Sequence, residues 1–193
     1  MSKKKLVIAV FILVAIMQLY VPAKMIIDRE DVLATGKEFK FKMAPVDPND
    51  PFRGKYITLR YKEDRVQLQS ENDWKRNEVI YVLLSTDKDG YATIRSVSKI
   101  KPAGDQDFVK AKVDYFMNDE NKNLIIAYPF DRFYMEESKA PAVEKVYNES
   151  LRDTTQVAYA LVNIKQGDAV IKDVLINGIP LQEIVKINNG NRK

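Results

Sequence analysis

The sequence contains no cysteine and no histidine in 193 residues. Without cysteine the chain has no disulfide and no thiolate nucleophile, and without histidine it has no imidazole for acid–base catalysis. Most zinc and haem sites use one of these two residue types, so we expect no metal and no cofactor. Any catalysis would have to use carboxylates, serine or lysine, and we assign no catalytic residue. Stability has to come from packing of the core.

A concentrated charge of one sign is also missing from most of the chain. The formal net charge of +4 arises from 31 Lys and Arg against 27 Asp and Glu. Lys3, Lys4 and Lys5 precede the first acid, Asp28, so residues from Lys24 onward carry 28 basic and 27 acidic side chains. A nucleic-acid-binding protein needs a basic face that neutralises several phosphates. We therefore expect no nucleic acid partner.

One long apolar run is present, Leu6 to Ala23, and its 18 residues carry no charge. As a helix it would be roughly 27 Å long, enough to cross the hydrocarbon core of a membrane. Lysines before such a segment remain cytoplasmic. The sequence thus predicts a basic tail at 1–5 and a single-pass membrane anchor at 6–23, with the rest of the chain exported. A signal peptide cleaved after Ala23 is the alternative.

We expect the exported part to consist of a stem at 24–36 that ends at Gly36, a β domain at 37–187 and a polar tail at 188–193. Short apolar stretches with a period of two residues predict about nine strands. The helical pattern that follows Pro141 and includes Tyr147 predicts one short helix. The expected fold is mainly β, with antiparallel sheets forming a sandwich or a partly open barrel. The clearest predicted strands are Phe39–Met43, Ile57–Tyr61, Glu78–Leu84, Tyr91–Val97, Val109–Tyr115, Leu124–Tyr128, Val157–Ile164 and Ala169–Ile176.

The segment Ala44 to Tyr61 holds the densest group of turn-forming and charged residues, APVDPNDPFRGKYITLRY. Its prolines favour extended or turn geometry, and aspartates at such positions bind nearby backbone amides. The group around Arg53 can therefore be a pinned turn. It can also be a recognition surface, because arginine and tyrosine are favoured at binding hot spots. Catalysis by paired carboxylates is a third interpretation.

The run VDPNDPFRGKYITLRY resembles the signature of the GDYXXLXY family of bacterial membrane-anchored proteins. The pattern in the family name corresponds to residues 54–61, with Lys55 where the family has aspartate. Phe130 to Glu137 is similar to an aromatic-rich stretch of the family, without its proline and glycine. The segment from Gly167 to Gly178 resembles the terminal hairpin of the family. No biochemical activity is established for these relatives, and their occurrence beside multi-pass membrane proteins implies a membrane partner.

Arg132, Tyr134 and Glu136 alternate along the second segment, so they share one side of the predicted strand. They can form a polar network that supports the core, or one wall of a site shared with the first segment. The candidate binding residues are Asp47, Asp50, Arg53, Gly54, Tyr56, Arg60, Tyr61, Arg132, Tyr134 and Glu136.

The expected function is that of a non-catalytic interaction or accessory module for another envelope membrane protein. The expected location is the bacterial cytoplasmic membrane, with the domain in the periplasm or outside the cell. The alternative is an extracytoplasmic ligand-binding domain or hydrolase that uses an Arg, Tyr and carboxylate pocket. Close approach of the two segments in space would strengthen the functional interpretation of both.

Overall fold

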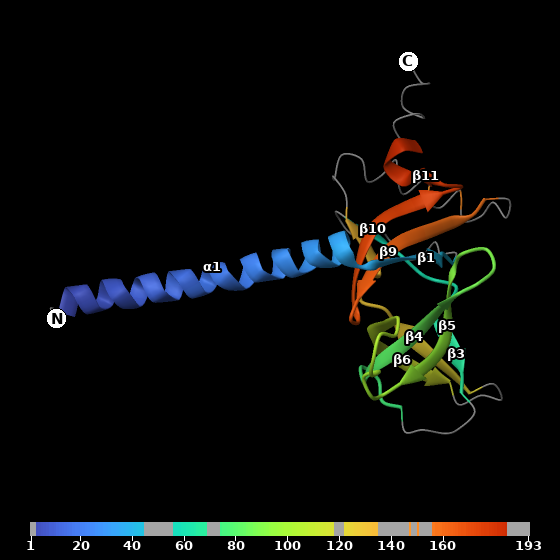
Figure 1. Ribbon diagram of the computed structural model, residues 1–193, viewed down its shortest axis with the longest axis horizontal. Helices are drawn as coiled ribbons and strands as arrows, with labels where there is room; N and C mark the ends of the chain where they lie inside the picture. Colours follow the sequence, from blue (N-terminus) through green and yellow to red (C-terminus); the bar gives the residue numbers. More distant parts are fainter. Residues whose placement is uncertain are drawn as a thin grey trace, which may run out of the picture.

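The computed structural model describes residues 3–44, 56–68, 74–117, 122–134, 147, 150 and 156–184. A single long helix, α1 (Lys3–Thr35), extends from a β domain (Figure 1). By length and composition α1 is able to cross a membrane. The predicted stem is part of this helix, so the apolar run and the stem form one continuous element. The helix ends at Gly36, whose backbone N–H donates to the Val32 carbonyl oxygen at 2.9 Å.

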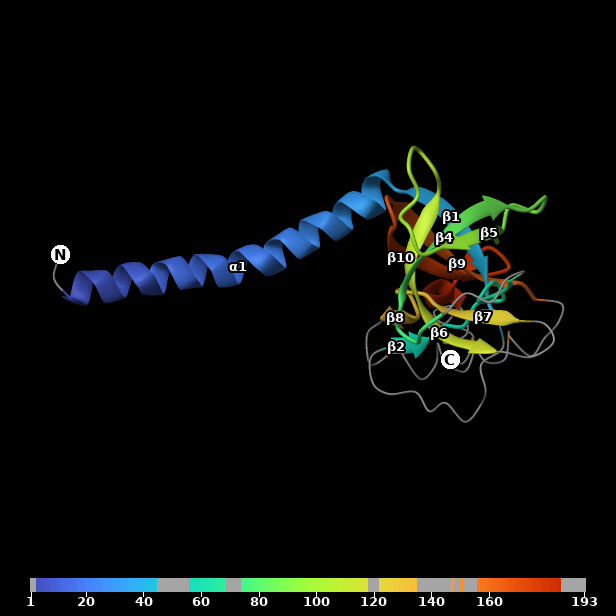
Figure 2. The ribbon, with the colours of Figure 1, turned by 90° about the horizontal axis from the view of Figure 1, so that it is seen from below.

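In the described part of the chain, eleven strands form three antiparallel sheets. A four-stranded sheet has the order β1 (Lys37–Lys42), β9 (Ala158–Lys165), β10 (Asp168–Ile176) and β11 (Ile179–Pro180). A five-stranded sheet has the order β3 (Arg65–Gln67), β7 (Asn123–Ala127), β6 (Phe108–Met117), β4 (Val79–Thr86) and β5 (Ala92–Ser98). The third sheet pairs β2 (Tyr56–Thr58) with β8 (Arg132–Tyr134), at the end of the domain from which α1 extends (Figure 2).

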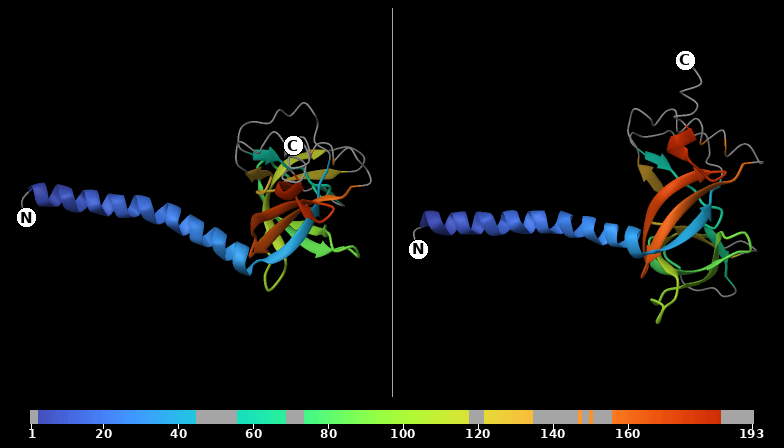
Figure 3. Two further views of the ribbon diagram at one scale, coloured as in Figure 1. Left: turned by 90° about the horizontal axis from the view of Figure 1, so that it is seen from above. Right: turned by 45° about the horizontal axis from the view of Figure 1, so that its top comes forward.

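Two isolated bridges join the larger sheets into a nearly closed barrel. The bridge between Lys40 and Tyr91 links β1 to β5, and the bridge between Val109 and Gly167 links β6 to the start of β10. The curvature of both sheets around a common interior is visible in Figure 3. The predicted mainly antiparallel β fold is confirmed, and of the two expected arrangements the structure has the barrel.

The core fills the interior of this barrel with the residues that alternate along the strands. Phe41 is fully buried, and its ring centroid lies 5.1 Å from that of Phe130 and 5.5 Å from that of Tyr61. The Tyr128 ring packs 5.0 Å from the Phe130 ring and completes an aromatic cluster. Aromatic pairs at these separations add to the energy gained from burial of their surface. Because Tyr61 belongs to this cluster, the end of the first predicted functional segment, residues 44–61, is packed into the core.

Two local features differ from the sequence expectation. Tyr115 continues the apolar alternation of β6, yet 47% of its surface is exposed. The pairing of β6 with β7 shifts between Val113 and Tyr115, and such a bulge turns the following side chain to the other face. Residues 181–184 form a helical turn that was not predicted. Of the predicted short helix, Tyr147 and Ser150 are helical, and the rest lies outside the described residues.

Candidate functional site

The two segments singled out from the sequence pair with each other as β2 and β8. Tyr56 lies opposite Tyr134, Ile57 opposite Phe133, and Thr58 opposite Arg132. The pairing is antiparallel and places side chains of both segments on common faces of a two-stranded ribbon. The two segments therefore lie side by side in space, which strengthens the functional interpretation of both.

The inner face of this ribbon belongs to the core, and its outer face is open. Ile57 and Phe133 are buried, with 4% and 9% of their surface exposed. The opposite face carries Tyr56 and Thr58, which are half-buried, and Arg132 and Tyr134, which are exposed. We refer to these four outward residues as the Tyr–Arg face.

Arg132 contacts both tyrosines of the Tyr–Arg face. Its guanidinium carbon lies 5.0 Å from the centroid of the Tyr56 ring, a cation–π distance. The Tyr56 and Tyr134 rings lie 5.5 Å apart at 54°. These contacts run across the strands between opposite and diagonal neighbours, the positions where side chains of a two-stranded ribbon meet. The face is thus ordered by its own contacts.

The charge on Arg132 is stabilised by its neighbours. The pKa of Arg132 is raised, first by a hydrogen bond to the Tyr134 side chain and then by the charge of Asp131. The Asp131 carboxylate lies 3.9 Å from the guanidinium, and both side chains are about half exposed. A guanidinium in this position offers a permanent cation with several donors beside two aromatic side chains. The Tyr–Arg face can bind a carboxylate, a phosphate or a row of carbonyl groups.

The Tyr–Arg face is next to α1. Arg29 of α1 lines the same hollow, of about 530 Å³, as Arg132 and Tyr134. The other side of this hollow is formed by β10, with Ala169 and Val170. A molecule bound at the Tyr–Arg face would therefore lie beside the last turns of α1.

The remaining candidate residues divide into three groups. Tyr61 is buried and does not reach the surface, because it continues the inward side of the strand pattern that starts at Ile57. Its hydroxyl donates to the Phe130 carbonyl oxygen at 2.6 Å, and burial raises its pKa well above the usual value. Arg60 is exposed, and its carbonyl oxygen accepts the Ala44 N–H. Five candidates lie outside the described residues: Asp47, Asp50, Arg53, Gly54 and Glu136.

A second hollow, not predicted from the sequence, lies where α1 meets the barrel. Its volume is about 520 Å³, and its walls come from α1, the outer side of β4 and β6, and the β9–β10 turn. The signal available in the sequence was Arg29, a basic residue between Met25 and Val32 in the stem. Thr58 was also missed, although it alternates with Tyr56. Among the described residues, no group of three or more acidic side chains could hold a metal ion.

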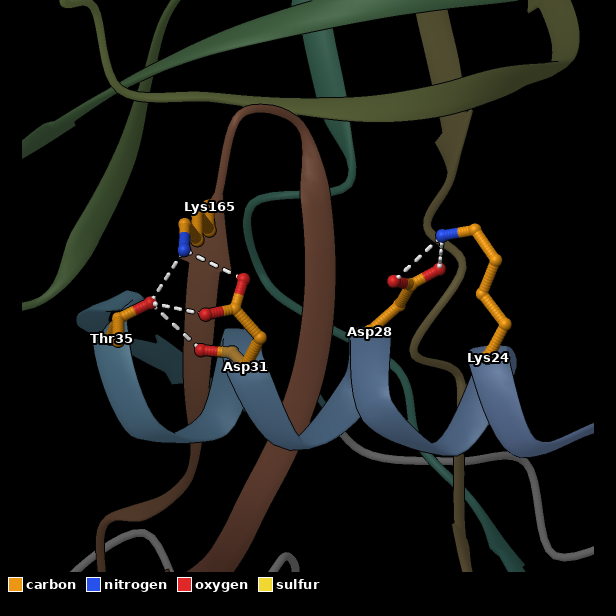
Figure 4. A network of polar contacts seen from close by, with 5 residues as sticks. All are labelled: Lys24, Asp28, Asp31, Thr35 and Lys165. Carbon is orange, nitrogen blue, oxygen red and sulfur yellow. Dashed lines mark hydrogen bonds and ion pairs between the residues drawn. The ribbon is translucent and has the colours of Figure 1, made fainter.

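Polar contacts fix α1 to the barrel beside this hollow (Figure 4). Lys165, at the end of β9, donates to Asp31 at 2.6 Å and to the Thr35 hydroxyl at 2.8 Å. The Asn163 side-chain amide donates to the Leu33 carbonyl oxygen at 2.7 Å. The last turns of the helix are therefore attached to one strand of the barrel by three hydrogen bonds.

Comparison with known proteins identifies the family. The family described as "GDYXXLXY protein" matches residues 18–174, which is most of the chain and includes the stem, β2, β8 and the β9–β10 hairpin. No curated protein and no solved structure matches the chain. The resemblance expected from the sequence motifs is confirmed, and the chain belongs to the GDYXXLXY family.

Proposed function

We propose that this protein is a single-pass membrane protein whose extracytoplasmic β domain is a non-catalytic interaction module for another membrane protein of the bacterial envelope. In this proposal α1 remains uncleaved in the cytoplasmic membrane and the β domain lies in the periplasm or outside the cell. The partner binds the Tyr–Arg face.

The properties of α1 support the membrane part of the proposal. Its apolar residues are exposed rather than packed against the domain, as a helix surrounded by lipid requires. Lys3, Lys4 and Lys5 at its start favour a cytoplasmic N-terminus. An exported domain follows from that orientation.

The observation that carries the interaction part is the pairing of β2 with β8. It creates an exposed face with two tyrosines and a charged arginine, the residue types that contribute most to binding energy in protein interfaces. The face lies at the end of the domain from which α1 extends, so a partner bound there would lie close to the membrane surface (Figure 2). A membrane protein meets that requirement.

The alternative function, a ligand-binding domain or hydrolase, needs further carboxylates beside Arg132 in addition to Asp131. The candidates for that role, Asp47, Asp50 and Glu136, lie outside the described residues. This alternative stays a prediction.

Site-specific photocrosslinking in native membranes tests the proposal. Tyr134, with 63% of its surface exposed, is replaced by benzoylphenylalanine, and Tyr115, 47% exposed on β6, is replaced in a matched control. We expect the Tyr134 position to capture a defined envelope membrane protein that the Tyr115 position does not capture. Arg132→Ala should lower this capture about tenfold. Equal capture from both positions, or none from Tyr134, would contradict the proposal.

A further inference from the structure

The hollow between α1 and the barrel is built from both elements. Met25, Arg29 and Val32 line it from the helix, and Lys110 and Lys112 line it from β6. The β9–β10 turn closes one end, where the Lys110 N–H donates to the Gly167 carbonyl oxygen at 2.9 Å. The hollow therefore depends on the fixed position of the helix against the barrel.

If α1 spans the membrane as proposed, one end of this hollow lies at the level of the lipid headgroups. Met25 is two residues beyond Ala23, where the apolar run ends, and a helix rises about 1.5 Å per residue. The lining thus begins roughly 3 Å beyond the apolar run, whereas the headgroup layer on each side of a bilayer is about 5–7 Å thick. In the proposed anchored state, the Met25 end of the hollow therefore lies within the headgroup layer, and Arg29 lies about 9 Å beyond the apolar run.

The charges that line the hollow are mainly basic. Arg29, Lys110 and Lys112 are exposed, and none of them forms an ion pair within the described part of the chain. Two carboxylates also line it, Asp28 and Asp168. Asp28 is already paired with Lys24 at 2.8 Å, so the remaining charge favours an anion.

The wall between these charges is apolar. Val79 is 39% exposed on the outward side of β4, and the next residue, Ile80, is fully buried. Ala127 is exposed directly opposite Lys112, and Val170 is half-buried at the far side. A ligand that matches this lining combines an anionic group with an adjoining hydrocarbon part.

We infer that this hollow binds the headgroup phosphate of one anionic phospholipid from the leaflet that α1 leaves. Arg29, Lys110 and Lys112 contact the phosphate, and Val79, Ala127 and Val170 contact the glycerol backbone and the first methylene groups. The inference rests on the membrane anchoring that forms part of the proposed function, and not on the Tyr–Arg face.

Photolabelling of the full chain in vesicles tests the inference. The protein is reconstituted into phosphatidylcholine vesicles that contain a trace of phosphatidylglycerol with a diazirine near the glycerol end of one acyl chain. A phosphatidylcholine with the same diazirine is the reference probe. Tryptic peptides 123–132 and 166–172 contain lining residues, and peptide 6–24 contains the apolar run. We expect the anionic probe to label the two lining peptides at least fivefold more than the reference probe does.

Two variants separate the hollow from general attraction to an anionic surface. Lys110→Gln with Lys112→Gln should reduce labelling of the lining peptides to the level of the reference probe. The matched variant, Lys62→Gln with Lys88→Gln, removes two exposed lysines that do not line the hollow and should leave labelling unchanged. Ala127→Trp fills the hollow without changing its charge and should also reduce labelling.

The outcomes distinguish failure of this inference from failure of the anchor. Labelling of peptide 6–24 alone, or equal labelling of the lining peptides by both probes, overturns the lipid site and leaves the anchor intact. Absence of label from peptide 6–24 as well overturns the anchor and the lipid site together.

Discussion

The ammonium group of Lys165 lies 2.6 Å from the carboxylate of Asp31, although the two residues are 134 positions apart in the chain. Asp31 belongs to the last turns of α1, and Lys165 ends the β9 strand. Burial does not strengthen this contact, since half of the Asp31 side chain is exposed. Its effect is geometric, because it sets the angle at which the helix leaves the barrel. In the proposed membrane-anchored state, that angle determines which surface of the domain faces the membrane.

Replacing Lys165 with methionine should loosen this attachment without unfolding the domain. An exposed ion pair contributes little to stability, so the free energy of unfolding should change only slightly. The distance between helix and barrel should become more variable. Because the chain has no cysteine, replacing Ile27 and Lys88 with cysteine in one protein gives two sites for spin labels without background labelling. Double electron–electron resonance should then show a broader distribution of the distance between the two labels in Lys165→Met than in the wild type.

The matched control is Lys172→Met. Lys172 forms an ion pair of similar exposure with Glu38 at 2.8 Å, and this pair does not involve α1. It should leave the distance distribution between positions 27 and 88 unchanged. Equal widths in the wild type and in Lys165→Met would show that other contacts alone hold the helix.

Replacing Tyr61 with phenylalanine tests the role that the structure gives this residue. The variant leaves the buried Phe130 carbonyl oxygen without the Tyr61 hydroxyl, which should cost about 1–3 kcal/mol of unfolding free energy. Tyr56→Phe changes the same atom on the half-buried Tyr–Arg face and should change stability by less than about 0.5 kcal/mol. Urea unfolding followed by the fluorescence of Trp74, the single tryptophan, measures both. Equal losses would place Tyr61 and Tyr56 in similar surroundings.

The two tyrosines show why only part of the site was predictable. Both lie in the motif at residues 54–61, and the period of two residues places their side chains on opposite faces of the strand. The pattern alone does not tell which of these faces is buried by the rest of the domain. The partner strand decides this, and the register of Tyr56 against Tyr134 depends on residues far apart in the sequence. The aspartate and arginine group before β2 could be recognised as a motif, and its candidate residues lie outside the described part.

The fold was more predictable than the site because most strands show their own alternation. Phe39 and Phe41 are both buried as expected, and the β9–β10 hairpin follows from the apolar runs on either side of its turn. The prediction that Tyr115 is buried is wrong, because a bulge depends on the neighbouring strand and not on local residue types. The hollow beside α1 could not be predicted, since it arises only where the end of a helix meets a distant strand turn.

Phe41 and Tyr115 together provide a test of the barrel interior. Phe41→Ala removes a fully buried ring that contacts three other aromatic rings and should cost about 3–5 kcal/mol. Tyr115→Ala removes an aromatic residue that the alternation of β6 assigns to the interior and that the bulge turns outward. It should cost much less, about 1 kcal/mol or below. Urea unfolding of both variants compares them, and a large loss for Tyr115→Ala would contradict the bulge.

The stability of the domain should depend on the ionisation of Asp87 in acid. One oxygen of this carboxylate accepts the Tyr91 N–H at 2.8 Å and the Asp89 N–H at 3.0 Å. These bonds, first the one from Tyr91, lower the pKa of Asp87 below its usual value of 3.8, and Lys42 adds to the effect. A carboxyl group with a lower pKa in the folded state stabilises the fold above the pKa of the unfolded chain. That contribution is lost as the pH falls through the folded pKa.

Asp87→Asn should therefore be less stable than the wild type at pH 7, and the difference should shrink as the pH falls below about 4. Urea unfolding at a series of pH values from 7 to 3 measures this difference. Asp89→Asn removes a carboxylate from the same turn and leaves the charged acceptor of the two N–H bonds in place, so it serves as the control and should show a smaller pH dependence. A difference between wild type and Asp87→Asn that stays constant over this range would show that the charge of Asp87 does not contribute to the stability of the turn.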